Sequence, residues 1–274
     1  MNTRSLREIA PSPTAFGASV SGMGTIYAIA NQKGGVGKTT TAVNAAACVA
    51  EADYPTLLVD VDPQCNATVG LGLPKDLEPT IYDVLSGRAS LDDGIRPSGV
   101  EGLDVVPSSP DLAGANVELP RIAGSETRLR EAVAPARDRY AFVFLDCPPS
   151  LGPLTVGALV AADRLLVPVQ TEYYALEGLA GLLDTVKLVQ ATLNPRLSVA
   201  GMVLTMHDGR TRLAQDVERE VRQHFDGLVF ETVIPRNVRV SEAPSFGVPV
   251  IHHDPRSAGA SAYFELAKEM AARG

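Results

Sequence analysis

Hydrophobic positions along the chain fall into short, nearly continuous apolar runs that alternate with longer segments of helical spacing. We predict strands for the apolar runs at 25–31, 56–63, 103–109, 140–149, 164–170, 198–206 and 229–235. We predict helices at 39–52, 175–193, 212–225 and about 257–272. Because the strands are apolar on both faces and separated by helices, they indicate a parallel sheet covered on both sides. The pattern therefore predicts a single α/β domain built on a twisted, mostly parallel sheet.

Two segments fall outside this alternation. Residues 1–24 are rich in Ser, Pro, Ala and Gly and lack the apolar core of a signal peptide. We therefore expect a flexible N-terminal tail ahead of one domain at 25–274. Residues 73–102 are expected to leave that domain as an excursion with one short helix. No apolar run in the chain approaches the roughly 20 residues that a membrane span needs.

The loop after the first predicted strand reads NQKGGVGKTT (31–40). A glycine-rich turn between a strand and a helix lets backbone N–H groups converge on an anion, and the helix dipole favours its negative charge. In such a loop Lys38 would reach the β- and γ-phosphates of a nucleotide, and the Thr39 hydroxyl would bind Mg²⁺. The usual consensus has glycine where Gln32 stands, whereas the K-G-G-x-G-K-T part is complete. The loop predicts a phosphate site and leaves the second lysine, Lys33, unexplained.

Acidic residues follow two other predicted strands. Asp60 and Asp62 lie two positions apart, so strand alternation puts both carboxylates on one side. Strand-end aspartates also cap turns, and for these two residues that alternative stays open. The apolar run at 140–149 leads into Asp146, whose carboxylate would hold Mg²⁺ through water. Ligands of parallel sheets bind beyond the carboxyl ends of the strands, so these residues are expected to meet the glycine loop.

Composition narrows the possible partners. The formal net charge of −8 argues against a globally basic nucleic-acid binder, but it leaves room for a local basic patch. Three cysteines lie far apart without metal-site spacing, which fits a reducing cytosol. Four late arginines would cluster if two loops are neighbours: Arg210, Arg212, Arg236 and Arg239. The alternative is a solvated helix face, because Arg219 and Arg222 alternate there with acidic residues.

Four ordered motifs resemble one family. KGGVGKTT matches the deviant Walker A motif of the ParA/MinD ATPases. With LLVDVDPQCNAT, FLDCPPSLG and IPRNVRVSEAPSFG, the chain looks like the chromosomal ParA (Soj) branch from about residue 25 to the C-terminus. The resemblance implies a single-domain P-loop NTPase fold with ATP and Mg²⁺ as cofactors. It also implies a cytoplasmic, nucleoid-associated protein.

The resemblance assigns roles to individual residues. Lys33 would reach across a nucleotide-sandwich dimer to the phosphates bound by the partner, Lys38 would bind phosphate in its own subunit, and Asp62 would position the attacking water. The implied nucleotide contacts are Lys33, Gly34, Gly35, Val36, Gly37, Lys38, Thr39 and Thr40, with base contacts from Met206, Pro235 and Asn237. The implied Mg²⁺ site comprises Thr39, Asp60 and Asp146. Arg210 and Arg239 match arginines that bind the DNA backbone without sequence preference.

Three functions compete at this stage. The first is a DNA-partition ATPase that forms an ATP-dependent homodimer, binds nucleoid DNA and hydrolyses ATP when a ParB partner stimulates it. The second is a MinD-like membrane-positioning ATPase. The C-terminal sequence SAYFELAKEMAARG argues against it, because it is short and carries Glu265 and Glu269, so no membrane partner is expected. The third is a metabolic P-loop enzyme that phosphorylates or amidates a small molecule. The second lysine and the lack of an evident substrate domain argue against that.

Overall fold

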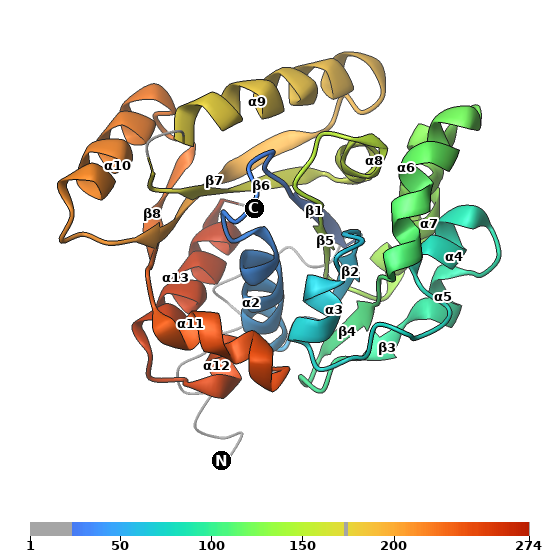
Figure 1. The fold of residues 1–274 in the computed structure, drawn as a ribbon, viewed down its shortest axis with the longest axis horizontal. Helices are drawn as coiled ribbons and strands as arrows, with labels where there is room; N and C mark the ends of the chain where they lie inside the picture. The colour runs from blue at the N-terminus through green and yellow to red at the C-terminus, as the bar shows by residue number, and fades with distance from the viewer. Residues whose placement is uncertain (1–23, 173–174, 274) are drawn as a thin grey trace.

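The computed structural model of the chain describes residues 24–172 and 175–273, and within them one eight-stranded sheet runs through the molecule (Figure 1). Its strand order is β3-β4-β2-β5-β1-β6-β7-β8, and each neighbouring pair is parallel except β3–β4. The strands are β1 (Thr25–Ile29), β2 (Thr56–Asp60), β3 (Arg96–Pro97), β4 (Leu103–Val106), β5 (Phe142–Asp146), β6 (Arg164–Gln170), β7 (Ser198–His207) and β8 (Val229–Pro235). The predicted α/β architecture with a mostly parallel sheet is confirmed.

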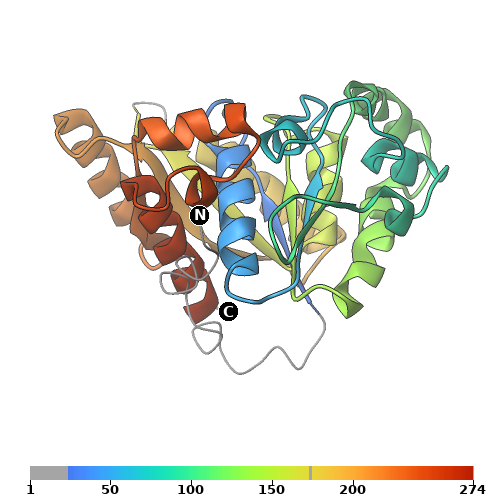
Figure 2. The same cartoon turned by 90° about the horizontal axis from the view of Figure 1, so that it is seen from below.

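Helices cover both faces of the sheet (Figures 1 and 2). Side chains alternate along β1, so Tyr27 and Ile29 enter one apolar cluster while Ile26 and Ala28 enter the other. The first face carries α2 (Lys38–Ala50), α3 (Asn66–Gly70), α11 (Val238–Glu242), α12 (Val250–His253) and α13 (Ala258–Ala272). The second carries α7 (Arg128–Val133), α8 (Pro153–Ala161), α9 (Ala175–Thr192) and α10 (Arg212–His224). At the β3–β4 end lie α4 (Ile81–Ser86), α5 (Leu91–Gly94) and α6 (Ala115–Glu118).

Three local predictions need correction. The excursion at 73–102 holds two short helices, α4 and α5, and ends in β3, which joins the sheet antiparallel at its edge. Helix α8 was not predicted, because its sequence PLTVGALVA is apolar all round and carries no amphipathic period. Gly24 is buried, and its N–H donates to the Arg137 carbonyl at 2.9 Å, so it belongs to the domain and not to the tail. The rest of the predicted tail lies outside the described residues.

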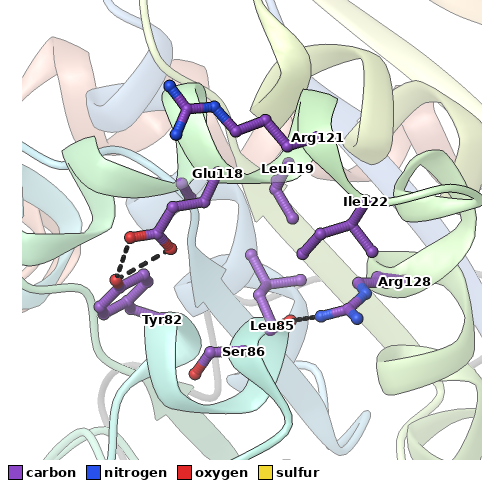
Figure 3. Close-up of a pocket in the computed structure, with 9 residues that line it drawn as sticks. Tyr82, Leu85, Ser86, Glu118, Leu119, Arg121, Ile122 and Arg128 are labelled. Atoms are coloured by element: carbon purple, nitrogen blue, oxygen red, sulfur yellow. Dashed lines mark hydrogen bonds between the residues drawn. The ribbon is translucent and has the colours of Figure 1, made fainter.

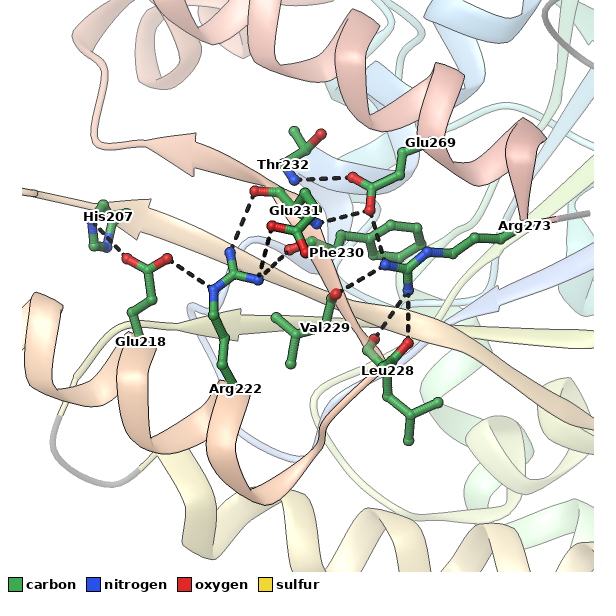
Figure 4. Close-up of polar contacts among 11 residues, drawn as sticks. His207, Glu218, Arg222, Leu228, Val229, Phe230, Glu231, Thr232, Glu269 and Arg273 are labelled. Atoms are coloured by element: carbon green, nitrogen blue, oxygen red, sulfur yellow. Dashed lines mark hydrogen bonds and ion pairs between the residues drawn. The ribbon is translucent and has the colours of Figure 1, made fainter.

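Strand β8 forms one edge of the sheet, and side chains from two helices bind its outer backbone groups (Figure 4). Glu269 of α13 accepts two backbone N–H groups at 2.8 and 2.9 Å. Arg222 of α10 and Arg273 donate to the carbonyls of this strand and of the turn before it. The bound groups belong to Val229, Phe230, Glu231 and Thr232, and to Leu228, whose carbonyl also accepts the Met202 N–H of β7 at 2.8 Å. The first half of this edge is therefore bound within the chain.

Candidate functional site

The glycine loop connects β1, near the middle of the sheet, to α2. Gly35 and Gly37 have φ angles of 74° and 85°, in the left-handed region that side chains other than glycine rarely adopt. Helix α2 has no acidic residue in its first turn, so no carboxylate of that turn competes for the N–H groups at its start. The other predicted loop residues occupy the same turn and the start of α2: Gly34, Val36, Thr39 and Thr40. The structure thus forms the glycine turn between β1 and α2 that the sequence predicts, and its binding of an anion stays a prediction.

Lys38 begins α2 and is only 6% exposed. Its Nζ donates to the Lys33 carbonyl at 3.2 Å, which ties the end of the loop to its beginning. Burial lowers the pKa of Lys38, while the nearby carboxylates of Asp146 and Asp62 oppose this shift. Burying an ammonium is costly unless negative charge compensates it. The phosphates of a nucleotide would supply such charge at this position.

Asp146 ends β5 and lies in register with Ile29 of β1 and Asp60 of β2. Both of its carboxylate oxygens are buried and lack a hydrogen-bond partner of normal geometry among the described residues. Burial raises the pKa of Asp146 well above its usual range, and Asp60 adds to the rise, whereas Thr39 and Lys38 oppose it. Unpaired buried carboxylate oxygens are rare and suit a cation or its bound waters. Thr39 and Asp146 therefore fit the predicted Mg²⁺ site.

Asp60 and Asp62 differ although both are buried. Asp60 Oδ1 accepts the Asp62 N–H at 3.1 Å, and its Oδ2 accepts the N–H and the hydroxyl of Thr68 at 2.9 and 2.7 Å. These bonds give Asp60 the turn-capping role that the sequence left open, and they favour Asp146 over Asp60 as the carboxylate that faces Mg²⁺. Asp62 Oδ1 accepts the Gln64 N–H at 2.9 Å, while its Oδ2 accepts no hydrogen bond from the described chain. The water-positioning role of Asp62 stays a prediction.

The residues predicted to contact the base lie near the ends of β7 and β8. Met206 has a φ of 50°, and the next residue, His207, is the pairing partner of Pro235. The sequence did not predict that Thr205 Oγ1 would donate to the Val36 carbonyl at 2.8 Å. This bond fastens the end of β7 to the glycine loop. Met206 and Pro235 are therefore held at neighbouring strand ends beside the predicted phosphate site.

Asn237, the third predicted base contact, lies immediately before α11. Its Oδ1 accepts the N–H groups of Arg239 and Val240 at 2.9 and 3.4 Å, so its oxygen serves as the helix N-cap. A contact with the base would have to use the side-chain amide nitrogen instead. That role is not tested by the cap geometry and stays a prediction.

Lys33 lies beside a carboxylate that the sequence analysis missed. Its Nζ is 3.6 Å from Oε2 of Glu172, which follows β6, and Arg236 Nη2 is 3.9 Å from Oε1 of the same residue. Gln170 Nε2 also donates to Glu172 Oε1 at 2.6 Å. The signal was available, because Glu172 is an acidic residue close to the carboxyl end of a predicted strand, as Asp62 and Asp146 are. The expected role of Lys33 in a dimer is not tested by this arrangement.

The four late arginines are exposed, and three of them have acidic partners. Arg210 binds Asp208 through two hydrogen bonds of 2.8 Å and lowers the pKa of Asp208 to about 2. Arg239 pairs with Glu242 at 2.9 Å and with Asp254 at 3.3 Å.

Pairing of β7 with β8 brings the two arginine loops side by side, because the Arg236 N–H donates to the His207 carbonyl at 2.9 Å. The charge of Arg236 also acts on Asp208, the partner of Arg210. Arg239 uses different carboxylates, Glu242 and Asp254. A DNA phosphate would therefore have to compete with carboxylates at both predicted contacts.

The C-terminal helix α13 packs inside the domain. Tyr263, Phe264, Leu266 and Met270 are buried in the cluster that also holds α2. The apolar face of α13 is thus used within the fold. In the parts of the chain that the structure describes, no helix combines the length and apolar composition of a membrane span.

A separate pocket of about 420 Å³ lies between α4 and the segment around α6 and α7 (Figure 3). Leu85, Leu119 and Ile122 contribute apolar surface, while the Tyr82 hydroxyl donates to Glu118 at its rim. None of the residues predicted to bind ATP, Mg²⁺ or DNA lines this pocket. It is therefore distinct from the site at the glycine loop.

Comparisons with known proteins give a consistent result. A family model described as an AAA domain matches residues 24–199. Sporulation initiation inhibitor protein Soj of Bacillus subtilis is 54% identical over 253 residues, which cover 92% of this chain and 100% of that protein. Chromosome-partitioning ATPase Soj of Thermus thermophilus is 56% identical over 247 residues, covering 90% and 95%. Cobyrinic acid a,c-diamide synthase from Mycobacterium smegmatis, solved with bound ADP and magnesium, has a TM-score of 0.79 at 36% identity, covering 89% and 93%. The chain belongs to the Soj/ParA family of chromosome-partitioning ATPases.

Proposed function

We propose that this protein is a Mg²⁺-dependent ATPase that partitions DNA by switching between an ATP-bound dimer and a free protomer. The observation that carries the proposal is a pair of buried ionisable groups beside the glycine loop, each of which pays a desolvation cost that its neighbours only partly offset. Lys38 is a buried ammonium with a lowered pKa, and Asp146 is a buried carboxylate without a hydrogen-bond partner of normal geometry in the described chain. A nucleotide triphosphate with Mg²⁺ satisfies both, because phosphate meets the ammonium and the cation meets the carboxylate.

Each residue then has one task in hydrolysis. The N–H groups of the glycine loop and Lys38 hold the phosphates, while Thr39 and Asp146 hold Mg²⁺, which neutralises charge on the phosphate oxygens. Asp62 orients the attacking water through Oδ2, which accepts no hydrogen bond from the described chain, while Oδ1 holds the Gln64 N–H. Lys33 of each protomer neutralises phosphate charge in its partner, which makes dimerisation depend on the triphosphate.

The cellular role follows from relatives and from the arginines. Two relatives with about half of their residues identical are named chromosome-partitioning proteins, ParA of Myxococcus xanthus and Soj of Thermus thermophilus. In the proposed cycle the ATP dimer binds nucleoid DNA through Arg210 and Arg239, and a ParB partner stimulates hydrolysis and release. Two arginine patches joined in one dimer contact more phosphates than a single protomer can.

Both alternatives have weaker support. A MinD-like membrane role needs an exposed apolar helix face, whereas the apolar face of α13 is buried against the rest of the domain. A small-molecule amidating enzyme is favoured only by the likeness to the M. smegmatis synthase, at 36% identity. The Soj proteins reach 54% and 56% over a similar share of the chain.

Lys33→Ala should separate nucleotide binding from dimerisation. The variant is expected to bind ATP as a protomer, because Lys38 and the loop N–H groups remain, yet it should fail to dimerise with ATP. Sedimentation velocity at matched protein concentrations measures this. Lys187→Ala is the control, since Lys187 is an exposed lysine of α9 that pairs with Asp184. An ATP-dependent dimer of normal affinity in Lys33→Ala would contradict the role of Lys33 across the interface.

DNA binding tests the partition role itself. Wild-type protein with ATP should bind random-sequence duplexes equally well, because backbone contacts carry no base information. Arg239→Ala removes one phosphate contact per protomer, so the slope of log K against log salt should fall by about 2 for the dimer. Dimerisation and basal hydrolysis should persist.

Arg88→Ala is the matched control for this measurement. Arg88 is 54% exposed and pairs with Asp83 at 2.8 Å, while Arg239 is 55% exposed and pairs with Glu242 at 2.9 Å. Arg88 lies just after α4, at the other end of the sheet from the β7 and β8 loops. No affinity of wild-type protein for DNA at low salt with ATP would overturn the partition role. If Arg239→Ala and Arg88→Ala lost the same amount of affinity for DNA, Arg239 would not be a specific contact.

A further inference from the structure

We infer that Glu172 is a positioning residue for ATP-driven dimerisation: it holds the Lys33 side chain within the protomer and must release it before Lys33 reaches the partner. The inference rests on the proposed function of Lys33. The contact lies inside one protomer. Glu172 and a phosphate bound by the second subunit would compete for the same side chain, that of Lys33.

Both ends of the contact are fixed to the same strand, β6. Asn31 Nδ2 donates to the Pro168 carbonyl at 2.7 Å, and Asn31 Oδ1 accepts the Lys33 N–H at 3.0 Å. Glu172 is fastened to the end of that strand, because its Oε1 accepts Gln170 Nε2 at 2.6 Å. These bonds fix the position of the Lys33 backbone relative to the Glu172 carboxylate. The Lys33 side chain spans the distance between them, so that its Nζ lies 3.6 Å from Glu172 Oε2.

The strength of the pair suits a reversible hold. Lys33 and Glu172 side chains are 31% and 46% exposed, so water screens their attraction. Exposed ion pairs shift an equilibrium by no more than about fivefold. A hold of this size raises the ATP concentration needed for dimerisation without preventing it. A triphosphate carries more negative charge than one carboxylate, so it outcompetes Glu172 once the two subunits meet.

Arg236 makes the release easier. Its Nη2 lies 3.9 Å from Glu172 Oε1, on the side of the carboxylate opposite the oxygen that faces Lys33. When Lys33 leaves, Glu172 keeps one cation and the Gln170 hydrogen bond, so no carboxylate is left without partners. Arg236 also belongs to the loop that leads into Arg239, so the exchange takes place beside the predicted DNA contact.

Glu172→Gln tests this directly. Glutamine keeps the size of the side chain and an oxygen that can accept from Gln170, but it removes the charge that attracts Lys33. Titration with a non-hydrolysable ATP analogue, followed by sedimentation, should show half-maximal dimerisation at a two- to fivefold lower analogue concentration than in wild type. The difference should shrink towards zero at 1 M salt, where the screening length falls to about 3 Å.

Two controls isolate the contact. Asp184→Asn removes an exposed carboxylate of α9 that pairs with Lys187, and it should leave the analogue concentration for half-maximal dimerisation unchanged. Adding Glu172→Gln to a Lys33→Ala background should leave analogue binding by the protomer unchanged, since the residue it acts on is already absent.

The outcomes separate this inference from the function on which it rests. If wild type dimerises with the analogue while Glu172→Gln dimerises equally well or less well, Glu172 does not restrain Lys33. The inference would also be overturned if Asp184→Asn lowered the analogue concentration for half-maximal dimerisation as much as Glu172→Gln does. The same holds if the effect of Glu172→Gln persisted at high salt. If wild type itself fails to dimerise, the proposed function fails instead.

Discussion

Lys38→Ala should strongly weaken ATP binding while leaving the domain folded. The substitution removes a charge-assisted contact to the phosphates, and such contacts contribute about 1.5–3 kcal/mol each, or roughly 10- to 150-fold in affinity. It also removes the bond from Nζ to the Lys33 carbonyl that ties the loop together. In wild type, ATP at about 100 times its dissociation constant should raise the melting temperature by about 5–10 °C, and at the same ATP concentration the variant should show at most about half of that rise.

The nucleotide-free stability of the variant provides an internal check. Burial lowers the pKa of Lys38 in the folded state, so the unfolded chain binds this proton more tightly than the folded chain does. At neutral pH the charged lysine therefore opposes folding, and a neutral residue of similar length removes that cost. Lys38→Met keeps the buried stem and should melt at or above the wild-type temperature without nucleotide. If ATP raised the melting temperature of Lys38→Met as much as that of wild type, the assignment of this segment as a phosphate loop would be wrong.

Asp62→Ala should bind ATP and dimerise but hydrolyse it about 10²- to 10⁴-fold more slowly, because the group that orients water is lost. Its complex with DNA should then outlast that of wild type, since release follows hydrolysis in the proposed cycle. Phosphate release under single-turnover conditions measures the chemical step, and sedimentation measures the dimer.

Asp62→Asn serves as the matched variant for this residue. Asparagine keeps an oxygen that can accept the Gln64 N–H, so it preserves the turn after β2 while removing the carboxylate. Slow hydrolysis in both Asp62→Ala and Asp62→Asn would show that loss of the carboxylate charge slows the reaction, and not a change in the turn after β2. A near-wild-type rate in Asp62→Asn, with or without a ParB partner, would rule out the carboxylate as the water-positioning group.

Local sequence was sufficient for the parts of the site that depend on backbone conformation. The left-handed angles of Gly35 and Gly37 and the start of α2 at Lys38 follow from a motif whose residues are adjacent in sequence. The sheet followed from apolar runs, because each predicted run is long enough and apolar enough to be buried. Helix α8 was missed for the opposite reason, since burial on all sides removes the period that identifies a helix.

Side-chain partners from distant segments could not be predicted in the same way. The hold of Glu172 on Lys33 depends on β6 lying next to β1, which the order of strands along the chain does not specify. The two oxygens of Asp60 are taken by Thr68 and by the backbone of Asp62, and only the path of the chain into α3 reveals this. The contact of Arg239 with Asp254 likewise depends on how the chain folds back after α11.

The partly bound edge at β8 bears on how these molecules behave when they are crowded. An exposed edge strand offers unpaired N–H and C=O groups to a strand of a neighbouring molecule, and that is a common route to aggregation. Here Glu269, Arg222 and Arg273 already bind those groups, and at the opposite edge β3 is only two residues long and ends in Pro97. Among the described residues, both margins of the sheet therefore offer another chain only a short length of free backbone. In the proposed cycle, this would let molecules concentrated along one stretch of DNA stay separate, with the predicted contact through the nucleotide site as the one that joins them.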